Sequence, residues 1–188
     1  GFLTEEEPDR VDFLVDALIN GQYSLERRTL LSAEAEGKCF FALNDVVVSR
    51  DSDSRMLEAD VFVNDEFVDR YFCDGYIVST PTGSTAYSLS AGGPILSPNV
   101  AAFILTSINS HSLHSRPIAV SENAEIALRI GGRGSVNLVV DGVSGARLSG
   151  GAEIRLKKSD AVVSFVRLSG HGFFNKLLTK LNKWGITS

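Results

Sequence analysis

The chain has 188 residues, of which 44% are hydrophobic, and this supplies enough apolar side chains for one domain with a sizeable core. Its 23 acidic and 18 basic residues give a net charge of −5, which argues against a nucleic-acid groove, because such a groove needs clustered Lys and Arg. No apolar run approaches the roughly 18 residues that a membrane span requires. We therefore expect no nucleic acid and no membrane among the partners.

The first predicted element is an amphipathic helix from Glu5 to Asn20. Thr4 and Glu7 have the spacing of a capping box, and Asn20-Gly21 is a typical helix end. The apolar residues of this segment recur at helical spacing and line one face: Val11, Leu14, Val15 and Leu18. We interpret residues 1–21 as a linker and a docking helix, not as a ligand site.

From Tyr23 the apolar period changes to two, and residues 22–168 read as successive strands joined by short turns. The segment from Leu57 to Val63 alternates in character, as expected for a sheet with two distinct faces. Asn64-Asp65 predicts a tight hairpin turn, because both residue types tolerate positive φ. The pattern predicts a mostly β domain, an antiparallel sandwich with an amphipathic helix at each end.

Asn44 and Asp45 stand in the middle of an otherwise apolar segment, Phe40 to Val48, that we predict to be one strand. Polar side chains in such a run are costly unless they find partners. They can mark a strand bulge or a satisfied polar pair. They can also recognise hydroxyl groups, because an amide donates and accepts hydrogen bonds and a carboxylate accepts them.

The stretch from Asp74 to Pro94 predicts a short strand, Tyr76 to Val78, followed by a hydroxyl-rich turn and a brief helix. Gly92-Gly93-Pro94 ends that helix. Thr80 fits an N-cap, and Pro81 fits the first helical position, where its missing N–H costs nothing. The helix therefore begins where the hydroxyl groups cluster.

The start of this helix suits a nucleotide. Its free N–H groups attract anions or carbonyl-type acceptors, Gly83 would let a ligand approach the backbone, and Tyr87 offers an aromatic face. The alternative is that the Ser/Thr/Gly cluster is only a capped turn. A P-loop is excluded because the stretch has no lysine. With this element close in sequence, we favour hydroxyl recognition for Asn44 and Asp45.

Two Asp-Gly pairs follow apolar or strand-like segments, Asp74-Gly75 and Asp141-Gly142. Asp-Gly is a common turn pair, so turn chemistry alone would explain both. Asp141-Gly142 comes directly after the predicted strand Val136 to Val140. Either aspartate can instead be a ligand contact.

The histidines and cysteines predict no metal site and no disulfide. His111 and His114 could share one helical face, but Pro117 close behind favours a loop, and no third ligand is evident. Cys39 and Cys73 lack metal-type spacing and are interpreted as reduced, buried thiols of a cytosolic protein.

The segment from Phe173 to Trp184 returns to a helical period. Its apolar stripe and its lysines lie on different sides, which is typical of a terminal helix packed on another surface. Residues 169–188 are therefore predicted to end the chain in a docking helix.

A stretch of about twenty residues resembles the long signature of the NAD kinases, enzymes that phosphorylate the adenosine ribose of NAD. It runs from Asp74-Gly75 through Ser79-Thr80-Pro81-Thr82-Gly83-Ser84-Thr85-Ala86-Tyr87-Ser88 to Gly92-Gly93-Pro94. Asn44-Asp45, about thirty residues earlier, is similar to the Asn-Glu/Asp pair of the same family. Further similar segments are Ile108 to Leu113 with Arg116-Pro117, and Val140-Asp141-Gly142.

The resemblance implies a carboxy-terminal, NAD-binding domain. Asn44 and Asp45 would hold ribose hydroxyl groups, and Asp74 would approach the other half of the dinucleotide. The adenine would be taken by the residues around Tyr87. The NAD-binding residues so implied are Asn44, Asp45, Asp74, Thr85, Ala86, Tyr87, Ser88 and Asp141.

The implied reaction transfers a phosphoryl group from ATP, or in some members polyphosphate, to the 2′-hydroxyl of the adenosine ribose of NAD, giving NADP. The implied cofactor is a divalent metal, Mg²⁺ with ATP. A homodimer or homotetramer is also implied, because some ligand contacts in the family cross a subunit interface. The expected location is cytoplasmic.

The Gly-Gly-Asp-Gly-Thr motif of the family, whose aspartate is the proposed base, does not occur in this sequence. The first residue is Gly1 rather than Met, and Gly1-Phe2-Leu3-Thr4 resembles the point where NAD kinases leave their first domain. We therefore expect a fragment without the amino-terminal α/β domain, on which the helices in residues 1–21 and 169–188 would pack. The catalytic base is expected upstream of Gly1, so none is named, and the fragment is expected to be inactive or nearly so.

Two other classes stay open beside this interpretation. One is a non-catalytic dinucleotide-binding domain, and the other is a related lipid kinase of the diacylglycerol kinase type. The stretch Thr80 to Tyr87 and the Asn44-Asp45 pair fit NAD kinases better than lipid kinases.

Overall fold

The computed structural model describes residues 11–51, 56–112, 114–132, 134–168, 173–175 and 177–178. The chain divides into two compact units. The larger consists of residues 29–162, and the smaller combines residues 1–28 with residues 163–188. The larger unit carries every residue that the sequence analysis singled out as a ligand contact.

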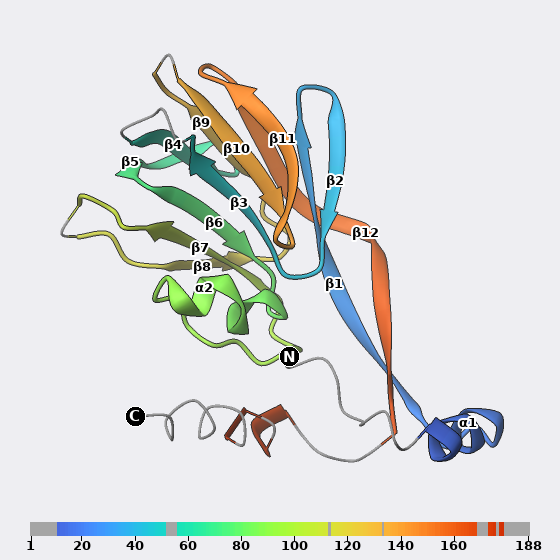
Figure 1. The fold of residues 1–188 in the computed structure, drawn as a ribbon. Coiled ribbons are helices and arrows are strands. Elements are labelled where there is room, and N and C mark those ends of the chain that lie inside the picture. The colour runs from blue at the N-terminus through green and yellow to red at the C-terminus, as the bar shows by residue number, and fades with distance from the viewer. Residues whose placement is uncertain are drawn as a thin grey trace. The chain divides into compact units, whose positions relative to one another are not determined.

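Within the described residues, twelve strands form two six-stranded sheets, ordered β2-β1-β12-β9-β4-β5 and β11-β10-β3-β6-β7-β8 (Figure 1). Every pair with an assigned register is antiparallel. The predicted mostly β sandwich is confirmed. The strands are β1 (Ser24–Ala35), β2 (Lys38–Ala42), β3 (Asp45–Arg50), β4 (Leu57–Val63), β5 (Glu66–Cys73), β6 (Gly75–Ser79), β7 (Ala102–Ile108), β8 (Ile118–Ser121), β9 (Ile126–Ile130), β10 (Ser135–Val140), β11 (Val143–Ser149) and β12 (Glu153–Arg167).

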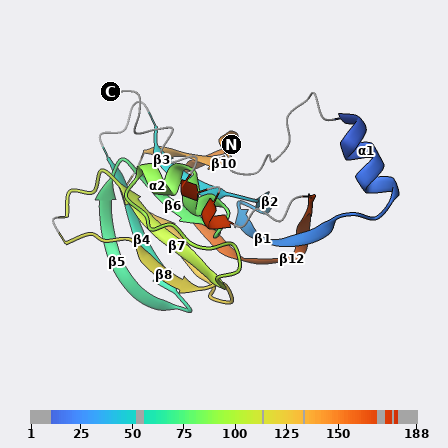
Figure 2. The ribbon, with the colours of Figure 1, turned by 90° about the horizontal axis from the view of Figure 1, so that it is seen from below.

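The core of the larger unit lies between the two sheets, which Figure 2 shows from below. Leu57, Ala59 and Val61 of β4 are buried, and the residues between them are partly exposed, as the alternation predicts. Val46 and Val48 of β3 join the same cluster from the other sheet. The intervening side chains of β3 therefore point to the opposite face of their sheet.

The hairpin predicted at Asn64-Asp65 is confirmed. Both residues have positive φ, 51° and 64°, and they join β4 directly to β5. A two-residue turn of this kind matches the twist of antiparallel strands, and Asn and Asp tolerate its backbone conformation.

The single strand predicted from Phe40 to Val48 is wrong. The chain forms β2 up to Ala42, breaks at Leu43 and Asn44, and continues as β3 in the other sheet. Asp45 is thus the first residue of a strand rather than a position inside one. The break brings the Asn44-Asp45 pair to the point where the chain changes sheets.

The hydroxyl-rich stretch forms two short helical pieces instead of one helix. The 3₁₀ helix η2 (Gly83–Thr85) and the α-helix α2 (Tyr87–Ser90) are separated at Ala86, whose φ of −100° and ψ of −130° are not helical. The predicted N-cap is wrong, because η2 begins at Gly83 and Thr82 precedes it, although Thr80 Oγ1 still accepts a hydrogen bond from the Gly83 N–H at 3.1 Å. Helix α2 lies against β6.

Gly83 serves a different purpose from the one predicted. It is buried, and a Cβ atom at this position would lie 1.9 Å from the Asn44 carbonyl oxygen. The glycine therefore admits the backbone of Asn44, and not a ligand. This contact packs the hydroxyl-rich turn against the break between β2 and β3.

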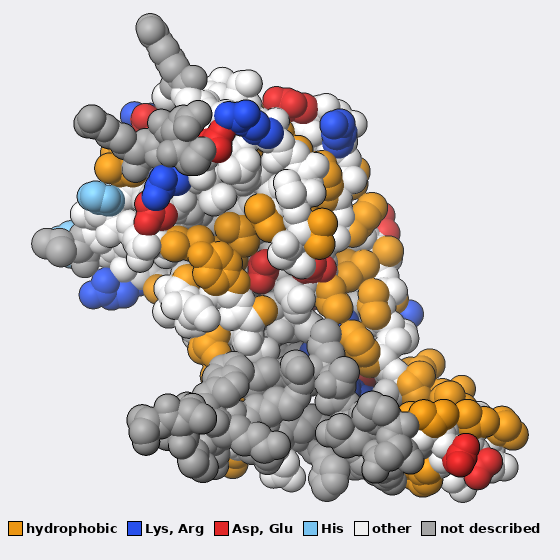
Figure 3. Space-filling model, in the orientation of Figure 1, with side chains coloured by type: hydrophobic (Ala, Val, Ile, Leu, Met, Phe, Trp, Pro, Cys, Tyr) orange, Lys and Arg blue, Asp and Glu red, His pale blue; other side chains and the backbone are white. Residues whose placement is uncertain are grey.

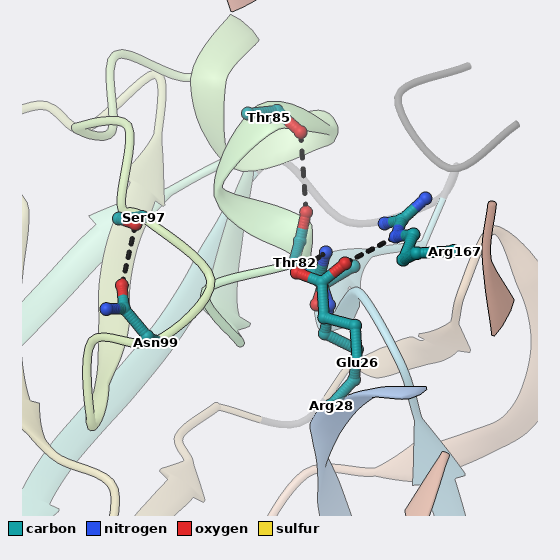
Figure 4. A network of polar contacts seen from close by, with 7 residues as sticks. All are labelled: Glu26, Arg28, Thr82, Thr85, Ser97, Asn99 and Arg167. Atoms are coloured by element: carbon teal, nitrogen blue, oxygen red, sulfur yellow. Dashed lines mark hydrogen bonds and ion pairs between the residues drawn. The ribbon is translucent and has the colours of Figure 1, made fainter. Parts of the chain in front are cut away.

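The smaller unit contains α1 (Val11–Ile19), in which Ala17 is the one residue buried. Residues 1–10, with Gly1 and the predicted helix start, lie outside the described residues. Within this unit Glu26 pairs with both Arg28 and Arg167 (Figure 4). Residues 173–175 and 177–178 are helical, as predicted for the terminal helix, whose remaining residues lie outside the described part.

The cysteine prediction is half right. Both thiols are free, and burial raises the pKa of Cys73 to about 12, but Cys39 is exposed. Among the described residues, no helix has the length and apolar character needed to cross a membrane.

The Gly83→Ala variant tests the packing of the two turns. Because the added methyl group would collide with the Asn44 backbone, we expect the free energy of unfolding to fall by about 2 kcal/mol or more. Urea denaturation measures this difference. Gly145→Ala is the milder comparison and should lower stability less, because its Cβ would meet a Phe40 ring carbon at 3.2 Å and the Leu138 carbonyl oxygen at 3.3 Å instead of a backbone atom at 1.9 Å. Equal stability of wild type and Gly83→Ala would contradict the packing.

Candidate functional site

A hollow of about 720 Å³ lies on the face of the β11-β10-β3-β6-β7-β8 sheet that is turned away from the core. Figure 3 shows acidic side chains set among apolar ones on the molecular face that Figure 1 presents. The residues lining the hollow come from β3, from β7, from β10 and its turn, and from the residues around β6 and the start of α2: Asn44, Asp45, Val47, Ser49, Arg50, Asp74, Ala86, Tyr87, Ile108, Asn109, Val139, Asp141 and Gly142.

Six of the eight predicted site residues line this hollow: Asn44, Asp45, Asp74, Ala86, Tyr87 and Asp141. They come from four separate parts of the chain, which the fold brings together at one surface. Their joint placement supports the prediction of a common site, although it does not assign a role to any one of them.

Asp45 is a buried carboxylate, only 4% exposed. Burial and the negative charge of Asp141 raise its pKa from 3.8 to about 6, and a hydrogen bond from the Tyr87 backbone N–H opposes that rise. The carboxyl group therefore titrates near neutral pH. It can accept hydrogen bonds from hydroxyl groups when it is ionised.

Asp141 occupies the tight turn between β10 and β11 and has a φ of 48°. Its carboxylate accepts hydrogen bonds from the backbone N–H groups of Leu43, Asn44 and Asp45, at 2.8, 2.7 and 3.1 Å. Both carboxylate oxygens are used in this way. Asp141 thus joins the β10–β11 turn to the break between β2 and β3.

Asp74 lies at another end of the hollow, between two donors. Its Oδ1 accepts from Arg50 Nε at 2.8 Å, and its Oδ2 accepts from Asn109 Nδ2 at 2.9 Å. The hydrogen bond from Asn109, followed by that from Arg50, holds the pKa of Asp74 below its ordinary value. This carboxylate is therefore ionised at neutral pH.

Tyr87 begins α2, and its side chain is 47% exposed at the hollow. An exposed aromatic ring beside buried polar groups can pack on a planar ligand while those groups bind its polar edges. Ala86 precedes it in the non-helical link between η2 and α2. Ala86 lines the same hollow as Tyr87.

Thr85 and Ser88 do not line the hollow. Ser88 is fully buried, and its hydroxyl group lies 3.4 Å from Thr106 Oγ1. Thr85 Oγ1 donates to the Thr82 carbonyl oxygen at 3.4 Å (Figure 4). Both hydroxyl groups therefore have partners inside the protein.

The sequence analysis missed several lining residues. Val47 and Ser49 could have been found from the alternation of β3, because they share a face with Asp45. Asn109 lies in a segment that already resembled the family. Arg50 and Val139 gave no signal, since their roles depend on strand pairing across the sheet.

The catalytic base is expected upstream of Gly1, before the first residue of this sequence. That expectation stays a prediction. The hollow is a candidate binding site, and we assign the role of the base to none of its carboxylates.

No group of three or more His, Cys, Asp or Glu suited to a metal ion occurs among the residues that the structure describes. His111 and His114 are exposed in an irregular segment, as predicted. The carboxylate oxygens of Asp141 are already used by backbone amides. The described residues thus provide no ready-made metal centre.

Comparison with known proteins gives a consistent family. The model of the ATP-NAD kinase C-terminal domain matches residues 43–168. The NAD kinase of Flavobacterium johnsoniae is 37% identical over 191 residues, which cover 98% of this chain and 65% of that protein. The NAD kinase of Thermoanaerobacter sp. is 41% identical over 189 residues, covering 97% of this chain and 67% of that protein. The chain thus spans about two thirds of its relatives' length.

Two solved structures share the fold. Yeast NADH kinase complexed with NADH superimposes with a TM-score of 0.89 at 30% identity, covering all of this chain and 56% of that one. An NAD kinase from Archaeoglobus fulgidus in complex with ATP has a TM-score of 0.80 at 28% identity, covering 97% of this chain and 70% of that one. The chain therefore belongs to the NAD kinase family, and residues 43–168 match its carboxy-terminal domain.

Proposed function

We propose that the protein is an NAD kinase that transfers the terminal phosphate of ATP to the 2′-hydroxyl of the adenosine ribose of NAD. In this proposal the described chain supplies the NAD-binding pocket. The supporting observation is that the Asn44-Asp45 pair and Tyr87 line one hollow. An amide, a buried carboxylate and an exposed ring are the groups that a nucleoside needs.

The residues that line the pocket are proposed to bind different parts of the dinucleotide. Asn44 and Asp45 bind ribose hydroxyl groups, and Ala86 and Tyr87 contact the adenine through the backbone and the ring. Asp74 contacts the other half of the dinucleotide. At about 3.3 Å per residue, β3 separates Asp45 from Arg50 by about 16 Å, which is enough for an extended dinucleotide.

Thr85 and Ser88 remain proposed ligand contacts, but their hydroxyl groups already have internal partners. A ligand would have to replace or share those hydrogen bonds. Their backbone groups and their support of α2 are the more direct ways in which they can contribute to adenine binding.

Phosphoryl transfer depends mainly on positioning and on neutralising phosphate charge, for which a Mg²⁺ ion bound with ATP supplies the positive charge. The described residues offer no metal cluster, so we expect the ion to be held chiefly by the ATP phosphates. This chain's part is to fix the acceptor ribose. We assign no catalytic base to it, because the Gly-Gly-Asp-Gly-Thr sequence does not occur in its 188 residues, and we propose that the base precedes Gly1.

The oligomeric state and the location are part of the same proposal. We propose a homodimer or homotetramer, because the family that the sequence resembles has ligand contacts that cross a subunit interface. NADP as product, polyphosphate as a second donor and a cytoplasmic location also stay predictions. The described chain is expected to bind NAD without appreciable turnover, so binding is the appropriate test.

Calorimetric titration with NAD tests the pocket directly. We expect Asp45→Asn to weaken NAD binding about tenfold, because a neutral amide accepts ribose hydroxyls less strongly than a carboxylate. Tyr87→Ala should weaken it by a similar factor, and Tyr87→Phe should keep most of the affinity because it keeps the ring. Phe67→Ala is the control, since this exposed ring belongs to the other sheet. Unchanged binding in both test variants would reject the proposed site.

Because Asp45 titrates at about pH 6, NAD affinity and the stability of the folded protein should change with pH in opposite directions. NAD affinity is expected to rise as pH increases through about 6, because ionisation of Asp45 strengthens its hydrogen bonds to hydroxyl groups. Stability changes the other way. An acid whose pKa is raised by folding stabilises the protein fully below its unfolded pKa, and this contribution is lost as pH rises through the folded value.

Urea denaturation and calorimetry at about pH 4.5 and about pH 7.5, roughly one and a half pH units below and above the titration of Asp45, measure both effects. Relative to wild type, Asp45→Asn should gain stability at the higher pH and lose the pH dependence of NAD affinity. If the variant keeps the wild-type affinity profile, Asp45 is not the titrating group.

A further inference from the structure

The break between β2 and β3 leaves three consecutive residues, Leu43, Asn44 and Asp45, with backbone N–H groups that need partners. All three donate to one side chain. Leu43 N–H bonds to Asp141 Oδ2 at 2.8 Å, and the next two bond to Oδ1 at 2.7 and 3.1 Å. Hydrogen bonds to a charged acceptor are stronger than neutral ones, so this carboxylate is well suited to fix the break.

The carbonyl oxygens of the same three residues also accept hydrogen bonds, and the donors belong to Thr80 and Asp141. Thr80 donates from Oγ1 to the Leu43 oxygen at 2.5 Å and from its backbone N–H to the Asn44 oxygen at 2.9 Å. Asp141 N–H donates to the Asp45 oxygen at 3.0 Å. All six backbone polar groups of the break are therefore satisfied by Asp141 and Thr80.

We propose that Asp141 and Thr80 are positioning residues, which hold the backbone of Leu43–Asp45 from two sides and so aim the Asn44 and Asp45 side chains into the hollow. Asp141 acts through these two residues instead of contacting the dinucleotide. The proposal rests on the NAD site proposed above, but its structural part can be tested without any ligand.

The geometry argues for positioning and against direct contact. Both oxygens of Asp141 already accept backbone N–H groups, so a ligand hydroxyl would have to compete with charge-assisted bonds. The Asp141 backbone is itself held by the turn, with φ of 48° followed by 79° at Gly142. On the other side of the break, Gly83 leaves no room for Asn44 to shift toward the Thr80 turn.

The effect of the Asp141 charge on the pKa of Asp45 distinguishes the contribution of Asp141 from that of Thr80. The groups that act on Asp45 are the Asp141 carboxylate from the β10–β11 turn and the Tyr87 backbone N–H from α2, while its cross-strand neighbour on β6 is the uncharged Ser79. Removing the charge of Asp141 must therefore lower the pKa of Asp45. Changing Thr80 alters geometry without altering charge.

The test compares Asp141→Asn with Thr80→Val in the full 188-residue chain. Amide hydrogen exchange of Leu43, Asn44 and Asp45 and the NMR titration of the Asp45 carboxyl are measured without ligand, and NAD affinity by calorimetry. Asp65→Asn is the matched control, because Asp65 also has positive φ in a tight hairpin turn and lines none of this hollow.

We expect Asp141→Asn to speed hydrogen exchange of the three backbone N–H groups about tenfold or more. The substituted side chain has an NH₂ group in place of one carboxylate oxygen, so it offers a donor where a backbone N–H needs an acceptor. It should also shift the Asp45 titration to lower pH and weaken NAD binding about tenfold. Thr80→Val should weaken NAD binding with the Asp45 titration unchanged. Asp65→Asn should change none of these quantities.

Three results would overturn the proposal. Wild-type exchange rates in Asp141→Asn would show that its carboxylate does not hold the break. Weaker NAD binding in that variant with unchanged exchange would show that Asp141 contacts the ligand itself. An unchanged NAD affinity in Asp141→Asn, while wild type binds NAD, would show that NAD binding does not require the Asp141 carboxylate to hold the break. If wild type fails to bind NAD, the proposed site fails, and exchange and titration still decide the positioning role.

Discussion

A chain that passes from one sheet of a sandwich to the other must satisfy the backbone groups that neither sheet can pair. Here the passage occurs at Leu43 and Asn44, and the Asp141 carboxylate takes the N–H groups that the break leaves open. Because this bond joins segments far apart in sequence, it also joins the pieces of the hollow. The site therefore lies where the chain crosses from one sheet to the other.

The hollow combines two carboxylates whose environments push their pKa values apart. Asp45 is raised to about 6 by burial and by Asp141, whereas Asp74 is lowered by its bonds to Asn109 and Arg50. Ionisation of Asp45 destabilises the folded protein, because burial and the charge of Asp141 outweigh the hydrogen bond from the Tyr87 N–H. Carboxylates whose pKa values are shifted in this way are typical of ligand sites.

Local features of this fold could be predicted from the sequence, and long-range ones could not. The Asn64-Asp65 hairpin and the alternation of β4 follow from residue type and spacing alone. The end of β2 could not be predicted, because the apolar run from Phe40 to Val48 contains no Gly or Pro that would mark it. The residue that makes the break possible, Asp141, is distant in sequence. The same applies to Arg50, which reaches the hollow only through the pairing of β3 with its neighbours.

The hydroxyl-rich stretch shows how a binding motif can be mostly structural. Thr80 bonds to the break, Ser84 Oγ accepts the Leu96 N–H and donates to the Pro81 carbonyl oxygen, and the Ser88 hydroxyl meets that of Thr106. All three side chains are fully buried. Only the following link and ring, Ala86 and Tyr87, reach the hollow. A motif of this length is therefore needed mainly to build a rigid support, since a short exposed segment would lose conformational entropy each time it bound a ligand.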